Sequence, residues 1–492
     1  MARALMLQGT GSDVGKSLLV AGLCRAASNR GIAVAPFKPQ NMSNNAAVCA
    51  GGGEIGRAQA LQARAARVES HVDMNPVLLK PQSDVGAQVV VQGRVLGNAA
   101  ASGYQNLKPR LLGAVIESFE RLCGEHELVI VEGAGSPAEI NLRAGDIANM
   151  GFALPLGVPV ALVGDIDRGG VIASLVGTHQ LLPAEERRLV IGFIINKFRG
   201  DVSLFEGGLR AIEARTGWQS FGVLPWLQQA SRLPAEDAVA LERTRSRGRG
   251  LKIAVPMLSR ISNFDDFDPL GQDPEVDLVM VPPGQALPGD ARLVIVPGTK
   301  ATLADLAFFE AQGWHVDLEA HLRRGGEVLG ICGGYQLLGT HVADPHGIEG
   351  PPDDRPGLGW LDVSTELLPG KSLRAVRGTH LGSGEAIAGF EMHVGRTTGP
   401  DTDSPLLSLH EPASGLERFD GARSRVHRVS GCYVHGLFAS DAFRGRFLAE
   451  LGAGGEGFAY ENQVEQALDD VAARLELHLD VDALLDSAAS MR

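Results

Sequence analysis

The chain has 492 residues, enough for roughly two to four domains, and 44% of them are hydrophobic, which permits several buried cores. Its net charge of −13 argues against nucleic acid or an anionic membrane as the main partner. Five cysteines without a CxxC pair, no leader-like start and no apolar run of about 18 residues predict a soluble protein of the reducing cytoplasm.

Short apolar segments alternate with helical patterns in the first half of the chain. Segments that are apolar on both faces and separated by helices predict a parallel sheet covered on both sides. Ligands of such sheets bind at the carboxyl ends of the strands, so the residues that follow strands are the candidates for a site. We expect strands at 4–7, 33–37, 128–131, 158–163 and 190–195, and helices at 16–30, 56–67, 107–123 and 204–216.

The first predicted strand runs into GTGSDVGKS, which is similar to a phosphate-binding loop. Such a loop has four residues between its first glycine and its Gly-Lys pair, whereas Gly9 and Gly15 enclose five. Backbone N–H groups around Gly11, Gly15 and the start of the next helix are suited to phosphate oxygens. Lys16 adds a charge for the outer phosphates and Ser17 a ligand for Mg²⁺, so we expect ATP and Mg²⁺ here. An exposed lysine in a Gly-rich turn is the alternative.

Three further strand ends carry polar residues. LVIVEGAGSP ends a buried strand with Glu132, a second candidate ligand for Mg²⁺. VALVGDIDRGG places Asp165, Asp167 and Arg168 at another strand end, where they either position an anionic substrate or pair with one another. IINKF supplies Asn196, whose amide is able to read a purine edge.

A basic segment without apolar periodicity, ALERTRSRGRG, divides the chain. We expect an ATP-binding domain at 1–239, a linker at 240–250 and a second α/β domain at 251–492. Strands are expected in the second domain at 252–256, 277–281, 293–296 and 327–331. An acidic amphipathic helix at 464–485 is expected to pack on its own domain.

The second domain contains a candidate nucleophile in GEVLGICGGYQLLG. Cys332 follows a strand, and the glycines after it permit the sharp turn that exposes a nucleophile at the start of a helix, which favours the thiolate. His435 in SGCYVHGLF is the favoured base because a glycine follows it, and His393 is the alternative. N–H groups of Gly333 and of Gly298, or of its neighbours, are the candidate oxyanion hole.

The two predicted sites explain each other. A cysteine that cleaves an amide releases ammonia, and an ATP site activates a carboxylate that ammonia then attacks. Together they predict a glutamine-dependent amide synthetase.

Several motifs jointly resemble the cobyric acid synthase family, the amidotransferases of cobalamin biosynthesis. The resemblance runs through most of both domains. It implies a P-loop parallel-sheet domain like dethiobiotin synthetase, whose branch shares the five-residue spacing, followed by a class I glutamine amidotransferase-like α/β domain. The motifs are GTGSDVGKS, FKPQNMSNNA, DMNPVLLKP, EGAGSPAEINL, GDIDRGG, INKFRGD, RISNFDDFDPL, GICGGYQLLG and YVHGLF.

The resemblance implies a reaction and roles for residues. The b, d, e and g carboxylates of adenosylcobyrinic acid a,c-diamide are phosphorylated by ATP and amidated with ammonia from L-glutamine, giving adenosylcobyric acid. Cys332 is implied as nucleophile and His435 as base, and Gln336 as a residue that helps to hold glutamine. Many class I enzymes place Glu two residues after the histidine, where this chain has Leu437. LPAEDAV also replaces a segment that is more acidic in the family.

Two other functions compete with this interpretation. The a,c-diamide synthase of the same pathway shares the two-domain plan, although FKPQNMSNN and DIDRGG favour the first choice. A regulatory ATPase of the deviant P-loop group with an inactive amidotransferase domain is the other, and the Cys332–His435 combination argues against it.

Overall fold

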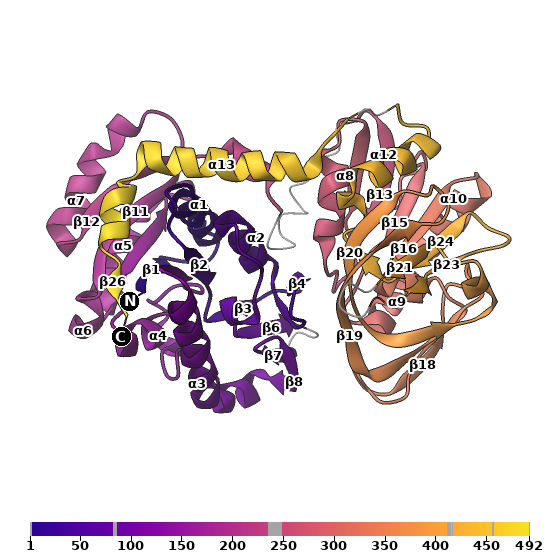
Figure 1. Cartoon of the computed structure of the whole chain (residues 1–492), viewed down its shortest axis with the longest axis horizontal. Coiled ribbons are helices and arrows are strands. Elements are labelled where there is room, and N and C mark those ends of the chain that lie inside the picture. The colour runs from indigo at the N-terminus through magenta and orange to yellow at the C-terminus, as the bar shows by residue number, and fades with distance from the viewer. Residues whose placement is uncertain are drawn as a thin grey trace.

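A computed structural model describes residues 2–81, 86–234, 248–410, 415, 417–454 and 457–491. These residues form two α/β units joined along one side by a long helix (Figure 1). No helix among them is long and apolar enough to cross a membrane. Residues 240–247 of the expected linker, and most of LPAEDAV, lie outside the described residues.

The first unit is built on a parallel sheet in the order β12-β11-β10-β1-β9-β2. All five strands expected in this half are present, and β12 adds one that the sequence analysis missed. The expected helices are also present, with α3 longer than predicted. The strands are β1 (Arg3–Gly9), β2 (Val34–Phe37), β9 (Leu128–Glu132), β10 (Val160–Asp165), β11 (Val190–Phe198) and β12 (Gln219–Pro225), and the helices α1 (Lys16–Asn29), α2 (Arg57–Ala66), α3 (Ala101–Glu125), α5 (Val171–Leu181) and α7 (Glu206–Thr216).

A small second sheet covers the side of the first unit that faces the second unit (Figure 1). Its strands were not predicted, because the sequence analysis searched for apolar segments separated by helices, whereas β6, β7 and β8 follow one another without a helix and β3 has only three residues. Ala46, Leu78 and Val90 from this side form a buried cluster with Met392 of the second unit. The two units therefore share an apolar contact. The strands are β3 (Gln40–Met42), β6 (Val77–Pro81), β7 (Gly86–Val91) and β8 (Arg94–Ala100), and a separate pair is β4 (Ala46–Val48) with β5 (Glu54–Gly56).

The second unit combines a mostly parallel sheet with a mostly antiparallel one. The four strands expected here are present in the order β14-β13-β15-β16, and β24 and β23 extend the sheet. A long hairpin forms most of the other sheet. The elements are β13 (Leu251–Pro256), β14 (Val276–Val281), β15 (Leu293–Val296), β16 (Glu327–Ile331), β23 (Ala422–Arg423) and β24 (Val429–Cys432), with β19 (Ser364–His380), β20 (Ala386–Thr398) and β25 (Val434–His435) in the second sheet.

The end of the chain returns to the first unit, which corrects the expectation that it packs on its own domain. Residues 464–485 are not one helix but parts of α13 (Tyr460–His478) and α14 (Val481–Asp486). Helix α13 crosses from the second unit to the first, and β26 (Ala489–Ser490) pairs antiparallel with β1 (Figure 1). The two ends of the chain thus meet at the start of β1, a central strand of the first sheet.

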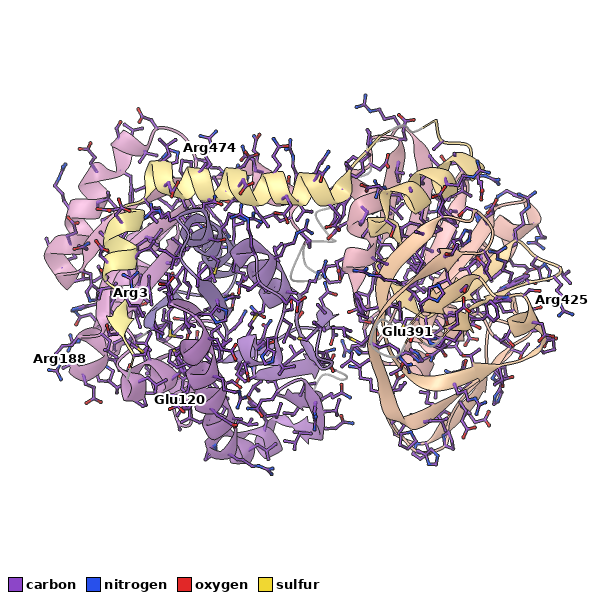
Figure 2. All side chains as sticks on the ribbon, viewed as in Figure 1. Arg3, Glu120, Arg188, Glu391, Arg425 and Arg474 are labelled. Carbon is purple, nitrogen blue, oxygen red and sulfur yellow. The ribbon has the colours of Figure 1, made fainter. Side chains whose placement is uncertain are left out.

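Helix α13 is held on α1 by both apolar and ionic contacts. Leu468, Val471 and Leu475 belong to the buried core of the first unit. Glu465 forms ion pairs of 2.6 Å with both Arg25 and Arg64, and only 1% of the Arg25 side chain is exposed. Because a buried guanidinium needs an acidic partner, the acidity of the tail serves this docking. Exposed charges such as Arg188, Arg425 and Arg474 point outward instead (Figure 2).

Substituting Gly22 with alanine should weaken the docking of α13. A Cβ atom at Gly22 would lie 2.8 Å from Leu475 and 2.9 Å from Val471, so the helices must separate. We expect a loss of about 1–3 kcal/mol in the free energy of unfolding, typical of overpacking, measured as a lower midpoint of thermal unfolding.

Gly113→Ala is the matched control within α3. A Cβ there meets nothing within 4 Å, and alanine is the better helix former. This variant should be stabilised by about 0.5–1 kcal/mol. Equal effects of the two substitutions would contradict the close α1–α13 contact.

Candidate functional sites

The nucleotide loop connects β1 to α1 in the first unit. Gly15 adopts a left-handed φ of 95°, and a Cβ atom there would lie 2.3 Å from the side-chain nitrogen of Asn196. Lys16 Nζ donates to the carbonyls of Gly11 at 3.0 Å and Gly135 at 3.1 Å. The lysine is therefore held across the mouth of the loop, between the two strand ends that the sequence analysis singled out.

Glu132, at the end of β9, collects donors from several elements. Its Oε1 accepts from Ser17 at 2.8 Å and from the buried Lys38 at 2.7 Å. Its Oε2 accepts from Gln62 of α2 at 2.6 Å and from Gln59 at 3.4 Å. The predicted pair of Ser17 and Glu132 is thus brought into direct contact.

The residues present suit a nucleotide with a divalent cation. A hydroxyl and a carboxylate side by side are hard oxygen ligands of the kind that Mg²⁺ prefers. The buried side-chain oxygens of Gln8 and Asn149 have no hydrogen-bonding partner among the described residues. A Cβ at Gly133 would lie 2.4 Å from that Asn149 oxygen. Polar atoms and bare backbone therefore surround the loop, as a phosphate site requires.

The candidate substrate residues pair with basic residues of the neighbouring strand. Asp165 lies 2.9 Å from Lys197 and Asp167 lies 2.6 Å from Arg199. Arg168, 61% exposed, pairs with Asp13 of the nucleotide loop at 3.1 Å.

Asn196 contacts the loop itself. Its Nδ2 donates to the carbonyl of Val14 at 2.8 Å, and its Oδ1 accepts from the N–H of Lys197. In this structure the Asn196 amide holds the nucleotide loop against β11, and its reading of a purine stays a prediction.

Cys332 occupies a sharp turn between β16 and α11 (Gly333–Leu337) in the second unit. Its φ of 52° is left-handed and thus strained for a residue with a side chain. Close packing explains the glycines after it, because a Cβ at Gly334 would lie 1.9 Å from the Val296 carbonyl oxygen. The expected nucleophile turn is present.

His435 is fully buried, and Asp266 orients it. The Asp266 carboxylate lies 2.7 Å from His435 Nδ1 and accepts from the N–H of Gly436 at 2.7 Å. Burial lowers the pKa of His435, but Asp266 and the adjacent Cys332 outweigh it and raise the pKa to about 10. Cys332 is the other titratable partner of His435, so the imidazole lies between the Asp266 carboxylate and the sulfur, as proton transfer requires.

His393, the alternative base, has a different environment. Burial and the neighbouring His435 lower its pKa to about 3. Its ring stacks on Tyr433 with 3.7 Å between the centroids. The ring lines the pocket beside Cys332, where it is a neutral wall.

The candidate oxyanion donors lie close to one another. A Cβ at Gly298 would lie 3.1 Å from the His435 ring, and one at Gly333 would lie 2.9 Å from the backbone nitrogen of Thr299. The 298–299 turn therefore packs against both His435 and the start of α11, and its role as an oxyanion hole stays a prediction.

Gln336 lines the same pocket, but its side chain is engaged. It donates to the Val394 carbonyl at 3.0 Å and to the Tyr433 hydroxyl at 3.2 Å, and accepts from Thr302. These hydrogen bonds of the Gln336 side chain hold the pocket wall in place.

Charged residues that the sequence analysis missed complete the pocket at Cys332. Lys300, Glu349 and Lys371 line it together with Gln88 of β7 in the first unit. Burial and Lys371 lower the pKa of Lys300 to about 8. Burial raises the pKa of Glu349. Two ammonium groups and one carboxyl beside a thiol suit a zwitterionic amino acid.

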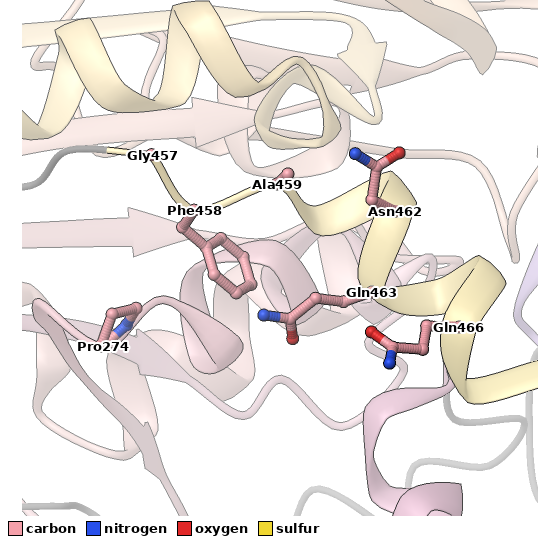
Figure 3. A pocket seen from close by; sticks show the side chains of 7 residues that line it. All are labelled: Pro274, Gly457, Phe458, Ala459, Asn462, Gln463 and Gln466. Atoms are coloured by element: carbon pink, nitrogen blue, oxygen red, sulfur yellow. The ribbon is translucent and has the colours of Figure 1, made fainter. Parts of the chain in front are cut away.

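Another hollow, at the start of α13, has no such chemistry (Figure 3). Phe458, Pro274 and the amide side chains of Asn462, Gln463 and Gln466 line most of it. None of its lining residues is a nucleophile, acid or base.

Asp266 is the residue that sequence analysis missed with the greatest consequence. Leu437 fills the position where Glu was expected, and is buried. The carboxylate comes instead from RISNFDDFDPL, far away along the chain. The two adjacent aspartates in that motif were the available signal, but nothing in the sequence placed them beside His435.

Two family matches cover most of the chain. Residues 5–240 match the CobQ/CobB/MinD/ParA nucleotide binding domain. Residues 252–443 match the CobB/CobQ-like glutamine amidotransferase domain. The first contains the loop and Glu132, and the second contains Cys332 and His435.

Relatives that match over nearly the whole chain include cobyric acid synthases. Cobyric acid synthase of Sinorhizobium fredii is 62% identical over 481 residues, covering 98% of each chain. Cobyric acid synthase of Mesorhizobium japonicum is 60% identical, covering 99% of this chain and all of its own. The solved structure of PurLQS from Thermotoga maritima is 17% identical, covers 45% of this chain and 98% of its own, and has a TM-score of 0.30, too low to carry an argument.

Replacing Asp266 with asparagine should impair proton transfer by His435 without emptying the pocket. The variant loses the carboxylate that raises the His435 pKa, so the basic limb of the pH profile for glutamine hydrolysis should move to lower pH. The rate at the optimum should fall by about 10²–10⁴. Steady-state hydrolysis between pH 6 and about 10 measures both effects. An unshifted limb would show that another group orients His435.

Proposed function

The chain belongs to the cobyric acid synthase family, and from this premise we propose that it amidates the b, d, e and g carboxylates of adenosylcobyrinic acid a,c-diamide. The observation that supports this most is the presence of two complementary sites in one chain. A thiol beside an oriented imidazolium lies in one unit, and a phosphate loop with an acidic ligand set lies in the other. Ammonia made at the first is what the second consumes.

At the thiol site, Cys332 Sγ attacks the side-chain amide carbon of L-glutamine. His435 Nε2 gives its proton to the leaving nitrogen, so that ammonia departs and a glutamyl thioester remains on Cys332. The neutral His435 then takes a proton from water as the water oxygen attacks the thioester carbon, so that the C–S bond breaks, glutamate leaves, and the cysteine sulfur and the imidazolium are restored. N–H groups of Gly298 and Gly333 stabilise the oxyanion at both steps.

Recognition of glutamine falls to the charged pocket residues. The α-carboxylate suits Lys300, whose ammonium faces Lys371 without an ion pair among the described residues. The α-ammonium suits Glu349. Gln336 keeps the wall of the pocket in place through Tyr433. The charges match a free amino acid better than a peptide, whose α-groups are blocked.

At the phosphate loop, the chain's residues are suited to ATP and Mg²⁺. ATP supplies the phosphoryl group that makes a carboxylate reactive toward ammonia. Gly11, Gly15 and Lys16 would hold its phosphates, and Ser17 and Glu132 would hold the cation. Asn196 fixes the loop through Val14.

Asp165, Asp167 and Arg168 stay candidates for the substrate side of this site. Their partners, Lys197 and Arg199, leave a mixed-charge edge beside the loop. Arg168 is an exposed cation of this edge, as is Arg199, and fits a carboxylate of the corrin periphery. We also propose that the protein works in the cytoplasm, where its five cysteines, all free in the structure, remain reduced.

Two substrates distinguish this function from that of the a,c-diamide synthase. With ATP, Mg²⁺ and glutamine, we expect amidation of adenosylcobyrinic acid a,c-diamide, followed by mass spectrometry of the corrinoid. Activity on undiamidated cobyrinic acid alone would overturn the proposal. ATP hydrolysis without any amide would favour the regulatory ATPase.

Cys332→Ala should separate the two sites. Glutamine-driven amidation should disappear, whereas amidation with added ammonium chloride should remain close to the wild-type rate, because the phosphate loop is unchanged. Loss of both activities in a folded variant would contradict separate sites.

His435→Ala should slow glutamine hydrolysis by a factor of about 10²–10⁴. His393→Ala should retain glutamine hydrolysis, because His435 is still present. The hydrolysis rates of both variants, measured at saturating glutamine, test the assignment. A collapse only in His393→Ala would reverse it.

A further inference from the structure

The segment that orients His435 is held by the first unit. Asp266 belongs to the short helix η6 (Phe264–Phe267), and the residues on either side of it are buried. The N–H of Phe264 donates to Asn45 Oδ1 at 3.2 Å, and Asn263 Oδ1 accepts from the N–H of Ala46 at 3.3 Å. The N-terminal end of η6 is thus tied to a loop more than 200 residues away in the chain.

An ion pair ties the same segment to α2. Arg57 Nε lies 2.9 Å from Asp265 Oδ2, and 7% of the Asp265 side chain is exposed. Burial and the adjacent Asp266 carboxylate raise the pKa of Asp265, whereas Arg57 lowers it. Without Arg57, two neighbouring buried carboxylates would compete for the proton of His435. Because the Arg57 guanidinium pairs with Asp265, Asp266 is the carboxylate that pairs with the His435 imidazole.

The same helix reaches the nucleotide site. Gln59 and Gln62 lie within two turns of Arg57 on α2 and both donate to Glu132. Gln62 also donates to the carbonyl of Ser17 at 3.2 Å. A cation bound by Ser17 and Glu132 would compete with these donors for the carboxylate oxygens. One rigid helix thus contacts both candidate sites.

We propose that Arg57 is a positioning residue for glutamine hydrolysis, acting through Asp265 and Asp266 on His435, and that α2 couples this position to occupancy of the nucleotide site. The inference rests on the proposed function. Coupling of this kind requires contacts that change when the nucleotide site is filled. The donors from α2 to Glu132 are contacts that a bound cation would alter, and the Arg57–Asp265 pair links the same helix to the segment that orients His435. Binding at either site then changes the binding affinity of the other site by the same factor.

The test compares Arg57→Ala with Arg57→Lys and with Arg64→Ala. Arg64 lies on the same helix but pairs with Glu461 and Glu465 of the tail, so it is the matched control. For each full-length protein, kcat and KM of glutamine hydrolysis are measured with and without AMP-PNP and Mg²⁺, alongside ammonia-driven amidation.

We expect the analogue to change the wild-type kcat by about fivefold or more. In Arg57→Ala, kcat should fall by a factor of about 10–10² with little change in KM, as expected when His435 is misplaced. The kcat of this variant should also no longer change when AMP-PNP and Mg²⁺ are added. Arg57→Lys should restore part of both. Arg64→Ala should behave as wild type, and ammonia-driven amidation should persist throughout.

If Arg57→Ala keeps the wild-type kcat and the wild-type change of kcat on adding AMP-PNP and Mg²⁺, this inference is overturned and the proposed function is left intact. A parallel loss of ammonia-driven amidation in Arg57→Ala would also overturn it, by showing a general structural role. A wild-type protein that hydrolyses no glutamine would instead overturn the proposed function.

Discussion

The hydrogen bond between Asp266 and His435 is the contact on which the chemistry of the second unit depends. It makes a buried histidine an imidazolium at neutral pH, against the penalty of burial. In the proposed reaction, this imidazolium beside Cys332 holds the proton that the departing ammonia needs. The strained turn at Cys332 and the 298–299 turn only present groups to this pair. The carboxylate itself depends on contacts that reach across from the first unit.

In the first unit, the contacts of the nucleotide site centre on Glu132. It is a buried carboxylate at the end of β9, and Ser17, Lys38 and Gln62 converge on it. The extra residue of the loop leaves Lys16 in reach of carbonyls from both Gly11 and Gly135. The buried Glu54, paired with Lys80 of its own unit and Lys371 of the other, joins the two units between these sites. Two reaction centres therefore share one set of buried interdomain contacts.

Local patterns were enough to predict most strands of the two main sheets and the residues at their ends, although β12, β23 and β24 were missed. Glu132 ends a buried strand, and Lys16, Ser17 and Cys332 come after one, so topology alone brings them to the right edge. Asp266 and the docking of α13 could not be predicted in this way, because each depends on contacts between distant parts of the chain. The acidic face of α13 is compatible with any basic partner, and only the fold selects Arg25 and Arg64.

Glutamine labelled with heavy nitrogen at its side-chain amide tests the central claim, that ammonia released at Cys332 is consumed at the phosphate loop of the same chain. The wild-type protein is supplied with ATP, Mg²⁺ and adenosylcobyrinic acid a,c-diamide, and the molecular mass of the corrinoid product is measured by mass spectrometry. The account predicts heavy nitrogen in every new amide, with ATP consumed in proportion. Hydrolysis of glutamine with no heavy nitrogen in the corrinoid would contradict it.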